Sequence, residues 1–313
     1  MQPEFVKTLI LGSGPAGWTA ALYAARAELA PVVLTGIDLG GQVALTYTVE
    51  NYPGFPEGVG GAQLGELFQK QAERFGAKVE FESAQSVDLS SRPFKVVTDN
   101  HVYLAHTLII TTGARPNLLG VPGEAEMTGM GISYCATCDG AFFKDRKVLV
   151  VGGGDSALEE GLFLTRYATS VTIIHRRDSL RAGPILQNRA KDNPKIGFVW
   201  NTVLTEVIGK NKVEAARLKN LQTGEESLLP TDGVFIFIGH TPSTQLFIGQ
   251  LEMENGYIRV DDRMQTSIPG VFAAGEAADS HFRQVITSAG MGAAAAMEAV
   301  KFLEQLTQEE VHD

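Results

Sequence analysis

Apolar and β-branched residues are concentrated in the run 6–11, where they predict a buried strand. A glycine-rich turn follows at 12–17, and an alanine-rich stretch with helical character occupies 19–29. A strand, a glycine-rich turn and a helix in this order are typical of the opening of a dinucleotide-binding fold. The glycines let backbone N–H groups approach a pyrophosphate at the positive end of the helix.

The same pattern returns later in the chain, with a β-rich run at 147–151, a glycine-rich turn at 152–157 and a helical run at 158–167. A chain of 313 residues exceeds one ordinary core and agrees with two domains. The sequence therefore predicts an α/β protein with two Rossmann-like three-layer domains, each binding a nucleotide.

The residues after each second strand distinguish the two sites. In the second copy of the pattern, the strand after the helix ends in His175, Arg176 and Arg177, and Arg181 follows shortly after. An NAD-binding site carries an acidic residue at this place. Arginines suit the dianionic 2′-phosphate of NADP, so we expect NADPH rather than NADH. The alternative interpretation is a solvated basic loop.

In the first copy the corresponding strand, residues 32–34, ends in Thr35 and Gly36 without an acid. The loop continues to Gly40, Gly41 and Gln42, and these residues would let backbone approach a flat ring closely.

The C-terminal part supplies more of the first site. A strand-like run at 270–274 ends in Gly275 and Glu276, and residues 288–292 open into a helix that we expect to reach about residue 306. A helix N-terminus aimed at a cofactor would stabilise negative charge, as on a reduced flavin. A surface helix capped by Thr287 or Ser288 is the alternative.

One domain therefore contains both chain ends, and the other is inserted between junctions rich in glycine and proline at 113–116 and 239–242. We predict a discontinuous first domain of residues 1–114 and 246–313 and an inserted domain of residues 115–245.

Composition and charge limit the partners. A hydrophobic content of 44% and a charged content of 20% describe a folded protein, and the net charge of −10 argues against nucleic acid or an acidic membrane surface. The N-terminus lacks the features of a signal peptide, and no window approaches 18 apolar residues. We therefore expect a cytoplasmic protein.

The chain has two cysteines, Cys135 and Cys138, in a Cys-x-x-Cys arrangement. A structural zinc site needs four ligands, and the chain has no second cysteine pair and only scattered histidines, so we expect no metal. A static disulfide across two residues would remove little unfolded-state entropy. Thiol–disulfide chemistry is the favoured interpretation, with idle buried thiols as the alternative.

Seven short motifs stand along the chain: Gly12-Ser13-Gly14-Pro15-Ala16-Gly17, Gly40-Gly41-Gln42, Val49-Glu50-Asn51-Tyr52-Pro53-Gly54, Cys135-Ala136-Thr137-Cys138-Asp139-Gly140, Gly152-Gly153-Gly154-Asp155-Ser156-Ala157, His175-Arg176-Arg177 and Arg283-Gln284. In this order and spacing the chain resembles, over essentially its whole length, the low-molecular-weight, bacterial and plant type of NADPH-dependent thioredoxin reductase.

The resemblance implies FAD in the discontinuous domain, NADPH in the inserted one, thioredoxin as partner and a homodimer. It also implies that Cys138 lies against the flavin, that Cys135 exchanges with thioredoxin, and that Asp139 acts as the acid beside them. The implied FAD-binding residues are Gly12, Ser13, Gly14, Pro15, Ala16, Thr35, Gly36, Gly40, Gly41, Gln42, Asn51, Thr112, Gly113, Gly275, Glu276, Arg283, Gln284 and Val285. The implied NADPH-binding residues are Gly152, Gly153, Gly154, Asp155, Ser156, Glu159, His175, Arg176, Arg177, Arg181, Ile238 and Gly239.

One departure concerns Glu276, because the family usually has aspartate there, with its carboxylate bonding the ribityl chain. Glutamate keeps the charge and adds a methylene, so we expect FAD to bind through a shifted contact.

The dithiol shares the inserted domain with the NADPH site, and both need the flavin. This favours rotation of one domain against the other about the two junctions, as occurs in the family. Two rival functions remain: a flavin-dependent disulfide oxidoreductase with another electron donor such as ferredoxin, and a non-catalytic thiol redox sensor.

Overall fold

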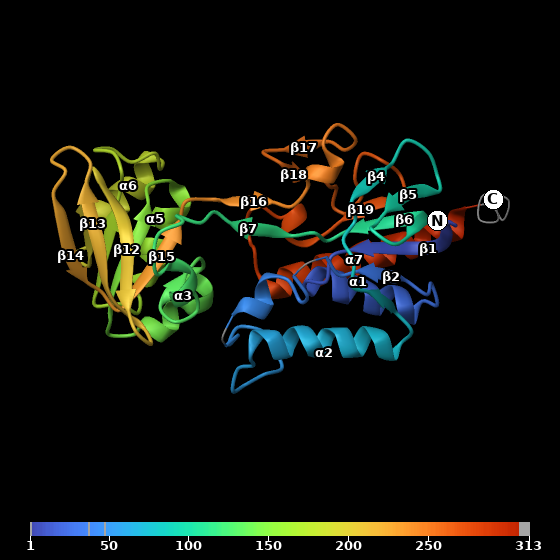
Figure 1. The fold of residues 1–313 in the computed structure, drawn as a ribbon, viewed down its shortest axis with the longest axis horizontal. Helices are drawn as coiled ribbons and strands as arrows, with labels where there is room; N and C mark the ends of the chain where they lie inside the picture. Colours follow the sequence, from blue (N-terminus) through green and yellow to red (C-terminus); the bar gives the residue numbers. More distant parts are fainter. Residues whose placement is uncertain (1, 37, 47, 307–313) are drawn as a thin grey trace. The chain divides into compact units, whose positions relative to one another are not determined.

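The computed structural model describes residues 2–36, 38–46 and 48–306, and the chain forms two compact units (Figure 1). Unit 1 comprises Met1–Arg115 and Thr241–Asp313, and unit 2 comprises Pro116–His240. The chain crosses between them in two short strands that pair with each other, β7 (Ala114–Pro116) and β16 (His240–Pro242).

The core of unit 1 is a parallel sheet in the order β3-β2-β1-β6. Strand β6 also pairs in parallel with β19 near its carboxyl end and antiparallel with β5, which pairs with β4. The strands of this sheet are β1 (Glu4–Leu11), β2 (Val32–Leu34), β3 (Lys78–Glu80), β4 (Ser86–Asp88), β5 (Phe94–Val97), β6 (Val102–Ile110) and β19 (Val271–Ala273).

Both faces of this sheet are covered. In β1, Leu9 and Leu11 belong to one hydrophobic cluster and the intervening Ile10 to the other, as expected where successive side chains point to opposite faces. The second cluster lies under three helices, which Figure 1 shows on one side of the sheet: α1 (Pro15–Arg26), α2 (Gly61–Arg74) and α7 (Val285–Gln305). Trp18 on α1 is 1% exposed and packs in this cluster.

Unit 2 has a parallel sheet in the order β11-β10-β9-β15-β8. Its strands are β8 (Ile132–Ser133), β9 (Lys147–Gly152), β10 (Ser170–Ile174), β11 (Ile196–Val199) and β15 (Gly233–Phe237). One face packs on α4 (Ala136–Asp139), α5 (Asp155–Leu164) and α6 (Pro184–Lys191). The other packs on an antiparallel sheet of β12 (Thr202–Gly209), β13 (Val213–Asn220) and β14 (Glu226–Pro230). The predicted α/β class, with two Rossmann-like three-layer units, is confirmed.

Smaller elements complete the described part of the chain. They are η1 (Gln42–Leu45), α3 (Glu124–Met127), η2 (Gly140–Phe143), η3 (Gln245–Phe247), β17 (Met253–Glu254), β18 (Tyr257–Ile258) and η4 (Gly275–Ala277). Among the residues described, no helix combines the length and the apolar character needed to cross a membrane.

The long C-terminal helix begins earlier than the sequence suggested. Helix α7 starts at Val285, so residues 288–292 lie inside its first turns. The reason is a capping box: the Gln284 side chain accepts from the backbone of Thr287, and Thr287 Oγ1 accepts from the Gln284 N–H. The alternative of a helix capped by Thr287 or Ser288 is therefore wrong, because Gln284 is the N-cap and Thr287 is the third residue of the helix.

Candidate functional site

The first glycine-rich turn lies between β1 and α1. Gly12 has a φ of 114°, and a Cβ there would stand 2.3 Å from the Thr111 carbonyl oxygen, so only glycine fits. The helix follows at Pro15, with Gly14 as N-cap and no side-chain cap in this described segment. Its first N–H groups are therefore available for an anion.

Ser13 connects this turn to the predicted cofactor loop. Its hydroxyl donates to the Thr35 carbonyl (2.8 Å) and accepts from the Gly40 N–H (3.2 Å). A Cβ at Gly41 would lie 3.0 Å from the Gly14 Cα, so the loop backbone runs directly against the turn. The structure thus brings together most of the loop 35–42, of which residue 37 lies outside the described residues.

Further contacts bring distant segments of unit 1 together. Asn51 Nδ2 donates to Gln284 Oε1 (3.2 Å), which joins residues 233 positions apart. A Cβ at Gly275 would stand 2.9 Å from the Ala16 Cβ, so η4 is packed against the start of α1. Just beyond β6, Thr112 Oγ1 is buried and has no hydrogen-bond partner in the described structure. The loop 35–42 and these segments also contain the other predicted residues, Gly36, Gln42, Gly113, Arg283 and Val285.

Glu276, the residue that departs from the family pattern, lies partly buried in η4. Burial raises the pKa of its carboxyl to about 7; nearby Arg283 lowers it and nearby Asp279 raises it. The Asp279 carboxylate is itself held by the backbone N–H groups of His281, Phe282 and Arg283. This turn places two carboxyl groups and one guanidinium just before α7.

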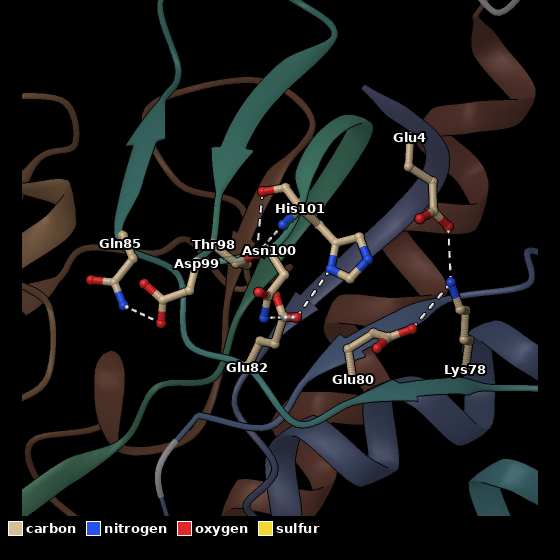
Figure 2. A network of polar contacts seen from close by, with 9 residues as sticks. All are labelled: Glu4, Lys78, Glu80, Glu82, Gln85, Thr98, Asp99, Asn100 and His101. Carbon is tan, nitrogen blue, oxygen red and sulfur yellow. Dashed lines mark hydrogen bonds and ion pairs between the residues drawn. The ribbon is translucent and has the colours of Figure 1, made fainter. Parts of the chain in front are cut away.

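A polar network lies next to the residues that hold the start of the loop 35–42 in unit 1 (Figure 2). The Glu82 carboxylate accepts from Asn100 Nδ2 (2.9 Å) and contacts His101 Nδ1 (3.0 Å). Hydrogen bonds from Thr98, Asn100 and His101 lower the pKa of Glu82. Because the Gly36 N–H donates to the Glu82 carbonyl, the network holds the start of the loop 35–42 in place.

In the same view, Lys78 joins Glu4 on β1 to Glu80 on β3. The Thr35 N–H in turn donates to the Glu80 carbonyl. Sequence reasoning missed this support because its members are ordinary surface residues, and only strand pairing brings them together.

The second glycine-rich turn lies between β9 and α5 in unit 2. A Cβ at Gly153 would stand 2.3 Å from His175 Nδ1, so the imidazole occupies the space that any other side chain would need. His175 is 5% exposed. Burial lowers the pKa of His175, a backbone hydrogen bond to Gly152 opposes this, and the nearby arginines lower it further. The neutral imidazole of His175 therefore packs against the backbone of the second glycine-rich turn.

The predicted arginines are divided between two segments. Arg176 and Arg177 are exposed immediately after β10. The Arg181 N–H donates to the Gly153 carbonyl (2.7 Å), and a Cβ at Gly154 would lie 3.9 Å from Arg181 Nη2. Arg181 therefore lies beside the start of α5, where Asp155, Ser156 and Glu159 are exposed. Ile238 and Gly239 follow β15.

The dithiol lies in unit 2 as a Cys135–Cys138 disulfide around the short helix α4. The Cys138 N–H points to Cys135 Sγ (3.1 Å). The Ala136 N–H donates to Glu160 Oε2 (2.9 Å), so α5, the helix that begins at the second glycine-rich turn, also holds the dithiol loop. Sequence spacing gave no sign of this role for Glu160.

Asp139 is the acid beside the disulfide. Burial raises the pKa of its carboxyl, while the hydrogen bond with Ser133 lowers it. Ser133 Oγ lies 2.5 Å from Asp139 Oδ2. A carboxyl whose burial favours the protonated form is suited to hold and deliver a proton.

Both sites fit the groups that the sequence implies. In unit 1 an open helix N-terminus, backbone brought close by Gly41 and the orphaned Thr112 hydroxyl provide donors for a phosphate and polar groups of a flavin nucleotide. In unit 2 the turn at Gly153 and the exposed arginines provide for a pyrophosphate and a 2′-phosphate.

Comparison with known proteins agrees with this geometry. The model of the pyridine nucleotide-disulphide oxidoreductase family matches residues 6–292. Two glycine-rich turns and a dithiol thus define a disulfide oxidoreductase linked to a pyridine nucleotide.

Individual relatives narrow the class. The thioredoxin reductase of Streptomyces coelicolor is 49% identical over 307 residues, which cover 96% of this chain and 95% of the relative. That of Rickettsia bellii is 51% identical over 303 residues, covering 95% and 98%. The crystal structure of thioredoxin reductase from Streptococcus pyogenes superposes with a TM-score of 0.93 at 42% identity, covering 97% and 100%. The chain belongs to the thioredoxin reductase family, and the resemblance found in the sequence is confirmed.

Proposed function

We propose that this protein is a thioredoxin-disulfide reductase that passes electrons from NADPH, by way of FAD, to the Cys135–Cys138 pair and on to the disulfide of thioredoxin. One observation carries the proposal: a redox disulfide lies in the same unit as an arginine-flanked glycine-rich turn. Family membership supports both cofactors, and no other electron donor would need the arginines.

Unit 1 would hold FAD, and unit 2 would hold NADPH. In unit 1 the start of α1, the loop from Thr35 to Gln42, and the Asn51–Gln284 pair would bind and orient the flavin nucleotide. In unit 2 Arg176, Arg177 and Arg181 would bind the 2′-phosphate. FAD, when bound, couples two-electron hydride chemistry to thiol chemistry.

The chain's own residues then complete the exchange. Cys135 would attack the thioredoxin disulfide, and Cys138 would resolve the mixed disulfide. Asp139 would hold the proton that this exchange requires.

The assembly and the movement belong to the same proposal. We infer a homodimer, as the resemblance implies, and a cytoplasmic location, as the sequence predicted. Because the dithiol and the NADPH site share unit 2 and both need the flavin, the two units would change orientation between half-reactions. The paired crossing strands β7 and β16 are the segments about which this movement would occur.

Coupled turnover tests the function. With FAD and NADPH supplied, the protein should reduce thioredoxin disulfide, and NADPH consumption should stop when thioredoxin is omitted. Cys138→Ser should keep FAD and NADPH binding and lose this turnover. Turnover that requires reduced ferredoxin, or unchanged turnover in Cys138→Ser, would contradict the proposal.

A further inference from the structure

Ser133 occupies the centre of the polar contacts around the dithiol. It ends β8, two residues before Cys135, and is 4% exposed. Its hydroxyl accepts from the Cys135 N–H (3.1 Å) and lies 3.1 Å from the Cys135 carbonyl oxygen. The Ser133 hydroxyl also donates to Asp139 Oδ2, at 2.5 Å.

The Ser133 hydroxyl connects the acid to the backbone of the dithiol loop. A serine hydroxyl has a single hydrogen to donate and can accept two hydrogen bonds. Here it accepts from the Cys135 N–H, and its hydrogen faces two acceptors, Asp139 Oδ2 at 2.5 Å and the Cys135 carbonyl oxygen at 3.1 Å. The contact with Asp139 is the shorter one, as expected of a charge-assisted hydrogen bond to a carboxylate.

We propose that Ser133 is a positioning residue that stabilises the Asp139 carboxylate, connects it to the backbone of Cys135 and thereby controls how readily the acid gives its proton to the dithiol. This role rests on the function proposed above. It goes further by naming the group through which the acid is controlled.

Burial and the Ser133 hydrogen bond act on Asp139 in opposite directions. Burial is the larger influence and raises the pKa of Asp139, and the Ser133 hydrogen bond lowers it. Helix α5, which packs against α4, carries Asp155, Glu159 and Glu160, and the Glu160 carboxylate is already engaged by the Ala136 N–H. The adjoining η2 has the sequence Gly-Ala-Phe-Phe and no titratable side chain.

Reduction of the disulfide consumes the proton of Asp139. Two electrons, supplied by NADPH in the proposed function, break the S–S bond and leave two thiolate sulfurs. One sulfur takes the proton of Asp139 and becomes a thiol, and the other stays a thiolate. Asp139 is then a carboxylate, and the hydrogen bond from the Ser133 hydroxyl stabilises its charge.

The test follows the Asp139 carboxyl in the oxidised protein, so it needs neither NADPH nor thioredoxin and is independent of the proposed turnover. Infrared difference spectra across pH would give the midpoint of the carboxyl band, with Asp139→Asn identifying the band. We expect the wild-type midpoint above the ordinary value of 3.8. Ser133→Ala should raise it further, by about one pH unit or more, because the carboxylate loses a charge-assisted hydrogen bond.

Ser133→Thr keeps the hydroxyl and should restore the wild-type midpoint. The rate at which iodoacetamide alkylates the reduced dithiol, measured across pH, should shift in Ser133→Ala and recover in Ser133→Thr. An unshifted Ser133→Ala midpoint would overturn the role of Ser133. If Ser133→Ala fails to fold, Ser133→Cys, whose thiol is a weaker donor, should also raise the midpoint, and an unshifted Ser133→Cys midpoint would overturn the role.

Discussion

Replacing Glu276 with glutamine removes a carboxyl whose pKa burial raises from 4.5 to about 7. A carboxyl with a raised pKa in the folded state takes up a proton on folding, so the free energy of unfolding falls as pH rises. The stabilisation is fully present below pH 4.5 and is lost progressively as pH rises through about 7. A shift of about 2.5 pH units at about 1.4 kcal/mol each corresponds to about 3.5 kcal/mol when the carboxyl is fully ionised.

Glutamine mimics the neutral acid and does not titrate. In FAD-free protein, Glu276→Gln should therefore unfold with nearly the wild-type free energy near pH 5. Near pH 8 it should be more stable than wild type by up to about 3 kcal/mol. The difference arises because the wild-type carboxyl must ionise in a buried place, between Asp279, which opposes its charge, and Arg283, which favours it.

Urea unfolding followed by tryptophan fluorescence measures this difference in the correct unit. The chain has two tryptophans, one in each unit, and Trp18 is buried in unit 1 with Glu276. A Trp200→Phe background leaves Trp18 as the reporter of unit 1. Glu66→Gln on α2, where the side chain is 59% exposed, is the matched control. Parallel pH dependences for wild type and Glu276→Gln between pH 5 and 8 would refute the reasoning.

Two further predictions concern the NADPH site. Gly153→Ala should destabilise unit 2 by about 1–3 kcal/mol in urea unfolding, because the new Cβ would stand 2.3 Å from His175 Nδ1. Adding His175→Ala should recover part of that loss, whereas strictly additive effects of the two substitutions would contradict the contact. Arg177→Ala should weaken 2′,5′-ADP binding roughly 10- to 100-fold by calorimetry through loss of a charge-assisted hydrogen bond, and should leave ADP-ribose binding almost unchanged. Equal losses for both ligands would show that Arg177 does not read the 2′-phosphate.

The parts that the sequence predicted are the locally encoded ones. A strand, a glycine turn and a helix are contiguous in the chain, so residues 6–17 and 147–157 are enough to reveal both dinucleotide-binding openings. The Cys-x-x-Cys pair is local in the same way. The start of α7 was misplaced because Gln284, an uncommon N-cap residue, begins the helix.

Contacts between distant segments could not be predicted. The Asn51–Gln284 hydrogen bond depends on how β1, β6 and β19 align in one sheet, and no local pattern records that alignment. No sequence motif assigned a role to Ser133, and the role proposed for it rests on three distances of 2.5 to 3.1 Å. The sequence named the reacting groups, whereas only the structure identified what positions them.

An anaerobic NADPH titration of the FAD-loaded protein tests the electron path most directly, with flavin absorbance and free thiols measured at each addition. If electrons pass through FAD to the Cys135–Cys138 disulfide, wild type should consume one equivalent of NADPH more than Cys138→Ser before the flavin stays bleached, because a disulfide takes up two electrons. Two free thiols should appear in wild type alongside that extra equivalent. Flavin that NADPH does not bleach, or identical titrations of the two proteins, would contradict the account.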